Sequence, residues 1–299
     1  LALAASGIVI LMLTTAAQAA GLPKCLFVSS YHQGYAWSDG VERGLRQTLN
    51  GKCEIQQFDM DTKRRKEQSD KEQAAIRAKD MIENWQPDIV IIADDNAARY
   101  LVQPFYKDAK LPFVFCGINW TVKDYGFPYS NVTGMIEVAP VKAMIEEANA
   151  LVPRASRVMY LGADTNTEKK NAARIRRAAE RQGLVFESRF VHQRDDWITA
   201  YEDGQGFDYI IVGSNAGIDG WDDAQVFEAI EPMSERLTVT NHEWMMPVSM
   251  LGMTKVPEEQ GEWAGQVALQ ILSGIQADRI PVVANRKWEL FVNPRLTQA

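Results

Sequence analysis

The sequence predicts an α/β fold made of two parallel-sheet units. Short runs of β-branched and aromatic residues alternate with longer stretches of helical spacing, which is typical of parallel α/β proteins. The second half repeats the outline of the first, since the strand and polar turn at 88–96 are echoed at 208–215. The length of 299 residues also exceeds that of one average domain. We therefore expect two similar units in one chain.

Eight segments are expected to form strands. Most are apolar at nearly every position, which indicates burial on both faces of a sheet. A turn-rich segment at 126–134 is the expected crossover between the two units, and a last strand-like run covers 290–292. In chain order, the eight strands span residues 25–29, 53–59, 88–93, 113–116, 157–161, 184–190, 209–212 and 237–240.

Amphipathic stripes between the strands predict the helices. Residues 74–85 and 141–152 each place apolar side chains on one helical face. Thr165 and Glu168 have the spacing of a capping box, in which each side chain accepts from the other residue's backbone N–H at the start of a helix. A last amphipathic helix covers 264–275 and follows an acidic start.

The charge balance and the first twenty residues limit the class of protein. Lys and Arg total 32 against 39 for Asp and Glu, so the net charge of −7 argues against nucleic acid as a partner. Residues 1–20 carry no charge and end in small residues with an Ala17-x-Ala19 pattern that a signal peptidase accepts. We expect a Sec signal peptide and a periplasmic protein. Retention of the segment as a membrane anchor stays open, because about 20 apolar residues can span a bilayer.

An exported protein meets an oxidising compartment, so its three cysteines can form disulfides. Cys25 and Cys53 both stand at strand beginnings. If the two strands are neighbours in a parallel sheet, their starts lie close enough for a disulfide. Cys116 is left over at the end of an apolar run, where a buried free thiol is expected. We therefore predict a disulfide between Cys25 and Cys53.

Polar and aromatic residues follow strand after strand. The carboxyl ends of parallel strands form the usual ligand site of open α/β sheets, because loops and helix N-termini converge there. Amides and carboxylates can orient a small polar molecule while aromatic faces supply contact area. Any one of these residues alone could equally be a helix cap or a turn residue. The predicted ligand-binding residues are Tyr31, His32, Trp37, Asp95, Asn96 and Asn119 in the first unit, and Asn166, Asn215, His242 and Glu243 in the second.

Motifs for catalysis are incomplete. No phosphate-binding loop or dinucleotide fingerprint occurs, and the three histidines lack metal-ligand spacing. We therefore expect no catalytic residues, no cofactor and no metal. Ser214 and His242 leave a hydrolase as an alternative, although Ser214 does not stand where a nucleophile elbow needs it.

Three segments together resemble a known family. The Tyr-His-x-Gly-Tyr-x-Trp sequence at 31–37, the turn at 93–98 and the closing segment at 292–296 are similar to uncharacterised ABC-transporter substrate-binding proteins, some of which bind aromatic amino acids. The similarity spans essentially the whole chain after residue 20. Many relatives that bind aromatic amino acids are lipoproteins, whereas this chain has no lipobox cysteine. Similar segments also occur in periplasmic input domains of sensor kinases.

The resemblance implies a type I periplasmic-binding fold, with two doubly wound lobes joined by a hinge and a ligand in the cleft between them. Lobe one is then expected at 21–133 with 254–280, and lobe two at 134–253 with 281–299. The implied function is capture of a small organic ligand, such as an amino acid or an aromatic compound, by a monomer that serves an ABC permease. The alternative is a ligand-sensing receptor for a membrane sensor kinase.

Overall fold

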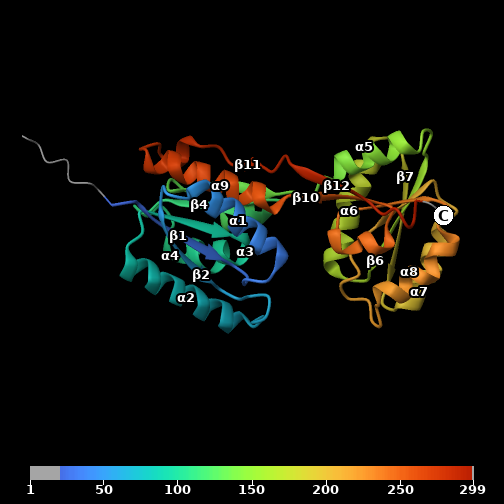
Figure 1. Ribbon diagram of the computed structural model, residues 1–299, viewed down its shortest axis with the longest axis horizontal. Coiled ribbons are helices and arrows are strands. Elements are labelled where there is room, and N and C mark those ends of the chain that lie inside the picture. The colour runs from blue at the N-terminus through green and yellow to red at the C-terminus, as the bar shows by residue number, and fades with distance from the viewer. Residues whose placement is uncertain (1–20, 298–299) are drawn as a thin grey trace, which may run out of the picture.

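The computed structural model describes residues 21–297, and the expected signal peptide at 1–20 lies outside them. Two six-stranded sheets form two lobes that lie end to end along the long axis of the molecule (Figure 1). Sheet A has the strand order β11-β5-β4-β3-β1-β2, and sheet B has the order β12-β10-β9-β8-β6-β7. The predicted fold class of two doubly wound parallel-sheet lobes is confirmed.

Sheet A is parallel throughout and carries helices on both faces. Its strands alternate their apolar side chains between two buried clusters, as burial on both faces requires. One cluster lies under α1 (Ala36–Leu49) and α9 (Pro257–Leu272), and the other lies under α2 (Gln68–Trp85) and the helical segment at 94–105. The strands are β1 (Lys24–Ser29), β2 (Glu54–Asp59), β3 (Ile89–Ala93), β4 (Phe113–Asn119), β5 (Val132–Glu137) and β11 (Val283–Ala284).

Sheet B repeats this plan, with one antiparallel strand at its edge. Helices α5 (Val141–Leu151) and α6 (Asn166–Arg181) cover one face, and α7 (Arg194–Gly204) and α8 (Asp223–Ile230) cover the other. Its strands are β6 (Arg157–Ala163), β7 (Val185–Val191), β8 (Tyr209–Val212), β9 (Leu237–Thr240), β10 (Leu251–Lys255) and β12 (Trp288–Val292), of which β12 is antiparallel.

Short helical segments occupy several of the connections. The segment after β3 is divided into α3 (Asp94–Ala97), the π-helical turn η1 (Ala98–Val102) and α4 (Gln103–Phe105). The 3-10 helices are η2 (Lys123–Tyr125), η3 (Glu231–Met233), η4 (Glu243–Val248) and η5 (Ala277–Arg279).

The chain passes between the lobes three times, after Glu137, after Lys255 and between Ala284 and Trp288. Each passage lies a few residues later than the expected boundaries at 133, 253 and 280. The reason is that β5 and β11 pair with each other in sheet A, and β10 stays in sheet B up to Lys255. We did not expect these strand pairings, because the segments that pair are distant in the sequence.

After the chain has returned from lobe two, helix α9 packs closely against α1. A Cβ atom at Gly261 would collide with the carbonyl oxygen of Val41, and one at Gly44 would collide with that of Glu258. Glycines at the contact therefore let the two helix backbones approach closely. This packing anchors the second passage of the chain to the body of lobe one.

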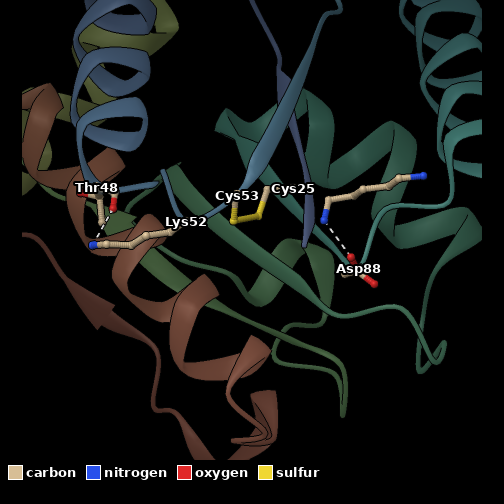
Figure 2. The surroundings of a disulfide bond; sticks show 6 residues. Cys25, Thr48, Lys52, Cys53 and Asp88 are labelled. Carbon is tan, nitrogen blue, oxygen red and sulfur yellow. Dashed lines mark hydrogen bonds between the residues drawn. A yellow bond between two sulfur atoms is a disulfide. The ribbon is translucent and has the colours of Figure 1, made fainter. Parts of the chain in front are cut away.

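The structure joins Cys25 and Cys53 in a disulfide (Figure 2). Strands β1 and β2 are parallel neighbours, with Cys25 opposite Ile55, and the two cysteine Cα atoms lie 5.8 Å apart. The backbone N–H of Lys24 also donates to Asp88 at 2.7 Å, which ties the start of β1 to the residue before β3. Cys116 is a buried free thiol in β4, and burial raises its pKa well above the ordinary value.

We predict that non-reducing peptide mass spectrometry of the protein, expressed with export to an oxidising compartment, will show Cys25 linked to Cys53 and Cys116 reduced. The matched control is Cys116→Ser, which should keep the crosslink because this thiol takes no part in it. The prediction is contradicted if Cys116 is bridged to either partner or if all three thiols are free.

Within the described residues, none of the helices has both the length and the hydropathy that crossing a bilayer requires. The same part of the chain holds no group of His, Cys, Asp and Glu side chains arranged to ligate a metal ion.

Candidate functional site

Strand β3 ends in an acidic turn at the carboxyl edge of sheet A. Asp94 is the first residue of α3 and has a φ of 69°, a backbone conformation that costs energy for a residue with a Cβ atom. Gly117 in the neighbouring β4 also has a positive φ of 70°, and a Cβ atom there would lie 2.9 Å from Oδ1 of Asp94. The backbones of β3 and β4 are therefore shaped around the Asp94 carboxyl group.

The Asp94 side chain is only 1% exposed. Its Oδ1 accepts a hydrogen bond from Nε1 of Trp37 at 3.1 Å, while its buried Oδ2 has no partner among the described residues. Burial, followed by the neighbouring charge of Asp95, raises the pKa of Asp94 to about 8. Strain, burial and an unpaired oxygen on one carboxyl group are features that proteins concentrate at functional sites. Asp94 is not among the predicted residues, although it directly precedes the predicted Asp95.

Asp95 organises the next part of the site. Its carboxylate accepts from Nδ2 of Asn119 at 2.7 Å and from the hydroxyl group of Tyr125 at 2.6 Å. The structure therefore brings together two predicted residues, Asp95 of α3, which follows β3, and Asn119 at the end of β4. Burial and the hydrogen bond to Asp95 raise the pKa of Tyr125.

Aromatic residues from the loop after β1 lie beside this acidic turn. The rings of Tyr31 and Tyr35 meet edge to face with centroids 5.4 Å apart, and the His32 ring lies 6.2 Å from Tyr35. Nζ of Lys63 lies 4.5 Å from the centroid of the Tyr31 ring. Burial, and then the charge of Asp94, raises the pKa of Tyr31. Predicted residues Tyr31, His32 and Trp37 thus share the edge that carries the acidic turn.

Asn96 has a local role in the structure. Its Nδ2 donates to Oγ1 of Thr62 at 2.8 Å, and Thr62 in turn donates to the carbonyl oxygen of Ser30. These bonds connect the loops that follow β1, β2 and β3. They make Asn96 a support of the edge.

Two charged residues at the passages between the lobes complete this region. Lys255 at the end of β10 forms an ion pair with Glu137 at the end of β5. Nζ of Lys255 also lies 5.0 Å from the centroid of the Trp37 ring. Burial lowers the pKa of Lys255 to about 8, while the charge of Asp94 opposes that shift. Because Lys255 and Glu137 are 118 residues apart, no local sequence pattern could pair them.

A second contact joins the lobes next to this ion pair. Trp120 in lobe one has a positive φ of 61°, and its N–H donates to the carbonyl oxygen of Glu137 at 2.9 Å. The guanidinium group of Arg174, on α6 of lobe two, lies 4.5 Å from the Trp120 ring centroid. A cation over an aromatic face is attractive, so this contact holds the two lobes together near the passages.

The predicted residues of lobe two stand at the carboxyl ends of three strands of sheet B. Asn166 opens α6 after β6, Asn215 follows β8, and His242 and Glu243 follow β9. Burial lowers the pKa of His242 to about 4, and the His242 ring lies 4.6 Å from Trp244. Hydrogen bonds in the described part of the chain do not join these four residues to one another or to the lobe-one set.

A buried carboxylate fixes the strand ends of lobe two. Glu168 is 2% exposed, and its Oε2 accepts from the Tyr160 hydroxyl group at 2.5 Å and from the Ser214 N–H at 2.9 Å. Gly213 leaves room for this arrangement, since a Cβ atom there would collide with both Tyr160 and Glu168. The predicted capping box is therefore only half correct: Thr165 accepts from the Glu168 N–H, but the Glu168 side chain turns inward and holds the loop that carries Asn215.

The hydrolase alternative gains no support from this geometry. The hydroxyl group of Ser214 accepts from the backbone N–H of Ala216 at 3.0 Å, and Nε2 of His242 has no hydrogen-bond partner among residues 21–297. A serine nucleophile needs a histidine base within hydrogen-bond reach.

Two surface hollows are lined by none of the predicted residues. One of about 590 Å³ is formed by α8, Pro247 and the segment around Arg295, and one of about 380 Å³ lies along α1 between Gln33 and Arg46. Neither contains a buried polar atom that lacks a partner. We favour the strand-end region because Asp94 and the aromatic residues converge there.

Comparison with known proteins identifies the fold. No family model matches the sequence, and no curated protein matches it either. A ligand-free, open substrate-binding protein with adhesive properties from Clostridium difficile matches with a TM-score of 0.75 and 13% identity over 93% of this chain and 94% of that one. An ABC domain in complex with L-Trp from Streptococcus pneumoniae matches with a TM-score of 0.61 and 19% identity over 92% and 94%.

A putative transcription repressor of the LacI family from Corynebacterium glutamicum also matches, with a TM-score of 0.56 and 13% identity over 90% of this chain and 97% of that one. Binding proteins and regulators therefore share the architecture, and function must be argued from the site. The fold implied by the resemblance is confirmed. The chain has the type I periplasmic-binding fold that ABC-transporter solute-binding proteins adopt.

Proposed function

We propose that this chain is an exported solute-binding protein that captures a small organic ligand between its lobes and delivers it to the membrane permease of an ABC importer. The observation that carries the proposal is the cluster of Asp94, Asp95, Tyr31 and Trp37 at the carboxyl edge of sheet A, directly beside the Lys255–Glu137 ion pair at the passages between the lobes. Binding and release, without chemical conversion, are sufficient for this role.

The chemistry of the cluster favours a ligand with a cationic group and a planar part. Asp94 and Asp95 supply two adjacent carboxyl groups, and a cation placed beside them would offset their mutual repulsion. The rings of Tyr31 and Trp37 offer faces for stacking or for cation–π contact. An amino acid with an aromatic side chain has both features, and the pneumococcal neighbour is in complex with L-Trp.

Lobe two supplies the opposite side of the proposed site. Asn166, Asn215, His242 and Glu243 all follow strands of sheet B and would meet the ligand when the lobes close. Closure about three chain passages is the hinge motion by which two-lobed receptors enclose ligands. Trp120 and its contact with Arg174 lie at these passages and would report the motion.

A thermal-shift screen of amino acids, purines, sugars and small organic acids tests the proposal. We expect aromatic amino acids or related amines to raise the melting temperature, because a ligand at a hundred times its dissociation constant stabilises the folded state by about 2.7 kcal/mol. Small-angle scattering with the hit should show a smaller radius of gyration. Stabilisation by sugars alone would reject the ligand class, and an unchanged radius with a tightly bound hit would reject closure.

A further inference from the structure

Strand β12 leaves an apolar stripe uncovered at the edge of sheet B. Trp288, Leu290 and Val292 alternate along the strand and are 46%, 53% and 57% exposed. Alternate residues of a strand lie on one face, so these three side chains form a single stripe. Exposed apolar groups that gather in this way mark interaction sites, whereas single exposed ones need no explanation.

The stripe continues the core of lobe two. In the antiparallel pairing of β10 with β12, Met253 lies opposite Leu290 and Leu251 lies opposite Val292. Directly opposed residues share a face of the sheet, and Leu251 and Met253 belong to the core under α5 and α6. Helices α5 and α6 therefore cover this face of sheet B as far as β10, and they leave the edge strand β12 exposed.

The backbone of β12 is also open on its outer side. The N–H of Asn293 donates to the carbonyl oxygen of Met250. Asn293 and Met250 are therefore a hydrogen-bonded pair of the antiparallel ladder. Pairs of the two kinds alternate along the ladder, so the peptide groups of Trp288, Leu290 and Val292 point away from β10. An edge strand with free peptide groups and apolar side chains is a template for pairing with another strand.

The outer strand at the other edge of sheet B differs. Strand β7 carries Glu187, Ser188 and Arg189 in its middle, and charged side chains protect an edge against association. In β12 the only charged residue is Glu289, which lies on the other face from the stripe.

We propose that β12 pairs with β12 of a second copy of this chain across a two-fold axis, which joins two B sheets into one continuous sheet. In this arrangement the side chains of β12 match those of the second β12 strand that lie opposite them. With Leu290 opposite Leu290 of the second copy, Trp288 faces Val292, and apolar residues meet on one face at all three positions. No like charges are opposed, because Lys287 faces Asn293 and Glu289 faces Phe291.

The pairing uses lobe two alone and leaves the movement of lobe one free. Strand β12 lies in sheet B, and the residues proposed to bind ligand stand at other strand ends. The dimer therefore does not depend on the proposed function, and the addition of ligand should leave the dimer dissociation constant unchanged. The proposed dimer differs from the monomer that the resemblance implies.

Sedimentation equilibrium of the exported chain over a range of concentrations tests the proposal. We expect a reversible monomer–dimer equilibrium that Leu290→Lys weakens at least about tenfold, because symmetry places two like charges directly opposite each other. The matched control is Val185→Lys on β7, a residue that is 58% exposed, and it should leave the equilibrium unchanged. Circular dichroism would confirm that both variants are folded.

Leu290→Cys in a Cys116→Ser background gives an independent measurement. Opposed residues of a hydrogen-bonded antiparallel pair have Cα atoms about 5.5 Å apart, which allows a disulfide. We expect a covalent dimer on mild oxidation, and none from Val185→Cys in the same background. The proposal is overturned if the chain sediments as a monomer at all concentrations, if Leu290→Lys leaves a dimer intact, or if β12 binds only a different protein.

Discussion

Replacing Asp94 by asparagine is expected to stabilise the unliganded protein at alkaline pH and to weaken ligand binding. The carboxyl group is buried, and its Oδ2 has no hydrogen-bond partner within the described chain, so ionisation in the folded state is costly. The folded-state pKa is raised to about 8 from an ordinary value of 3.8. Asparagine keeps an oxygen for the Trp37 hydrogen bond and cannot ionise.

The sign of the pH effect follows from this pKa. Above about pH 4 the unfolded chain releases the proton of Asp94, while the folded chain retains it up to about pH 8. The free energy of unfolding therefore falls as the pH rises through this window. Each pKa unit corresponds to about 1.4 kcal/mol, so the upper limit of the loss is roughly 6 kcal/mol. Asp94→Asn should remove this loss and match the wild type near pH 4.

Ligand affinity should change in the opposite direction. A cationic group bound beside Asp94 would favour the ionised form of its carboxyl group. Asparagine cannot supply this charged partner, which removes about 1.5 to 3 kcal/mol and corresponds to a 10- to 150-fold weaker complex. Urea unfolding at pH 5 and 8 and calorimetry with the hit from the screen measure the two effects. A stabilised variant that binds poorly would mark Asp94 as a functional residue that costs stability.

Asp108→Asn is the matched control in the same lobe. Asp108 accepts hydrogen bonds from the backbone and the hydroxyl group of Ser130, and these bonds lower its pKa. Its contribution to stability is present above the unfolded pKa and is lost as the pH falls, so this variant should be less stable at pH 8 and bind normally. An Asp94→Asn protein that is less stable than the wild type at pH 8, or that binds the hit with unchanged affinity, contradicts our interpretation.

Replacing Glu168 by alanine is expected to destabilise the protein by about 3 to 5 kcal/mol, because it removes the acceptor of buried donors and leaves a space. The Tyr160 hydroxyl group and the Ser214 N–H both lose their partner, and Nδ2 of Asn171 loses its bond to Oε1. Since Ser214 is released, Asn215 should also lose its fixed position, and ligand affinity should fall with stability. Urea unfolding and calorimetry measure the two effects.

Thr165→Ala separates this network from the cap of α6. Thr165 accepts the Glu168 N–H and makes no contact with Tyr160 or Ser214 in the hydrogen-bond network, so the loss should be about 1 kcal/mol. A loss of less than 1 kcal/mol for Glu168→Ala would show that the loop after β8 is held by other contacts.

Features with a local origin could be predicted from the sequence. Strands β8 and β9 match the expected ranges 209–212 and 237–240, because short apolar runs bounded by turn formers specify buried strands. The edge that carries Tyr31, Asp95 and Asn119 was also predictable, since the carboxyl ends of parallel strands lie together. The hydrogen bond between Asp95 and Asn119 follows from the adjacency of β3 and β4.

Features that depend on distant partners could not be predicted. Strand β11 has two residues and exists only through its pairing with β5, about 150 positions earlier in the chain. The raised pKa of Asp94 depends first on its burial in the folded chain, and its left-handed backbone depends on the local fold, neither of which a residue pattern records. The inward turn of Glu168 likewise required Tyr160 and Ser214 to be in place.

The sequence by itself determined the two parallel-sheet units, the positions of most strands along the chain and the edge of sheet A at which polar and aromatic residues gather, because these follow from local patterning and chain direction. Only the tertiary structure decided that Lys255 and Glu137 meet where the lobes join, that Asp94 is a buried carboxyl group with an unpaired oxygen, and that β12 is an uncovered edge. Each of these depends on which segments pack together and on what is excluded from water, and those properties arise only when the whole chain has folded.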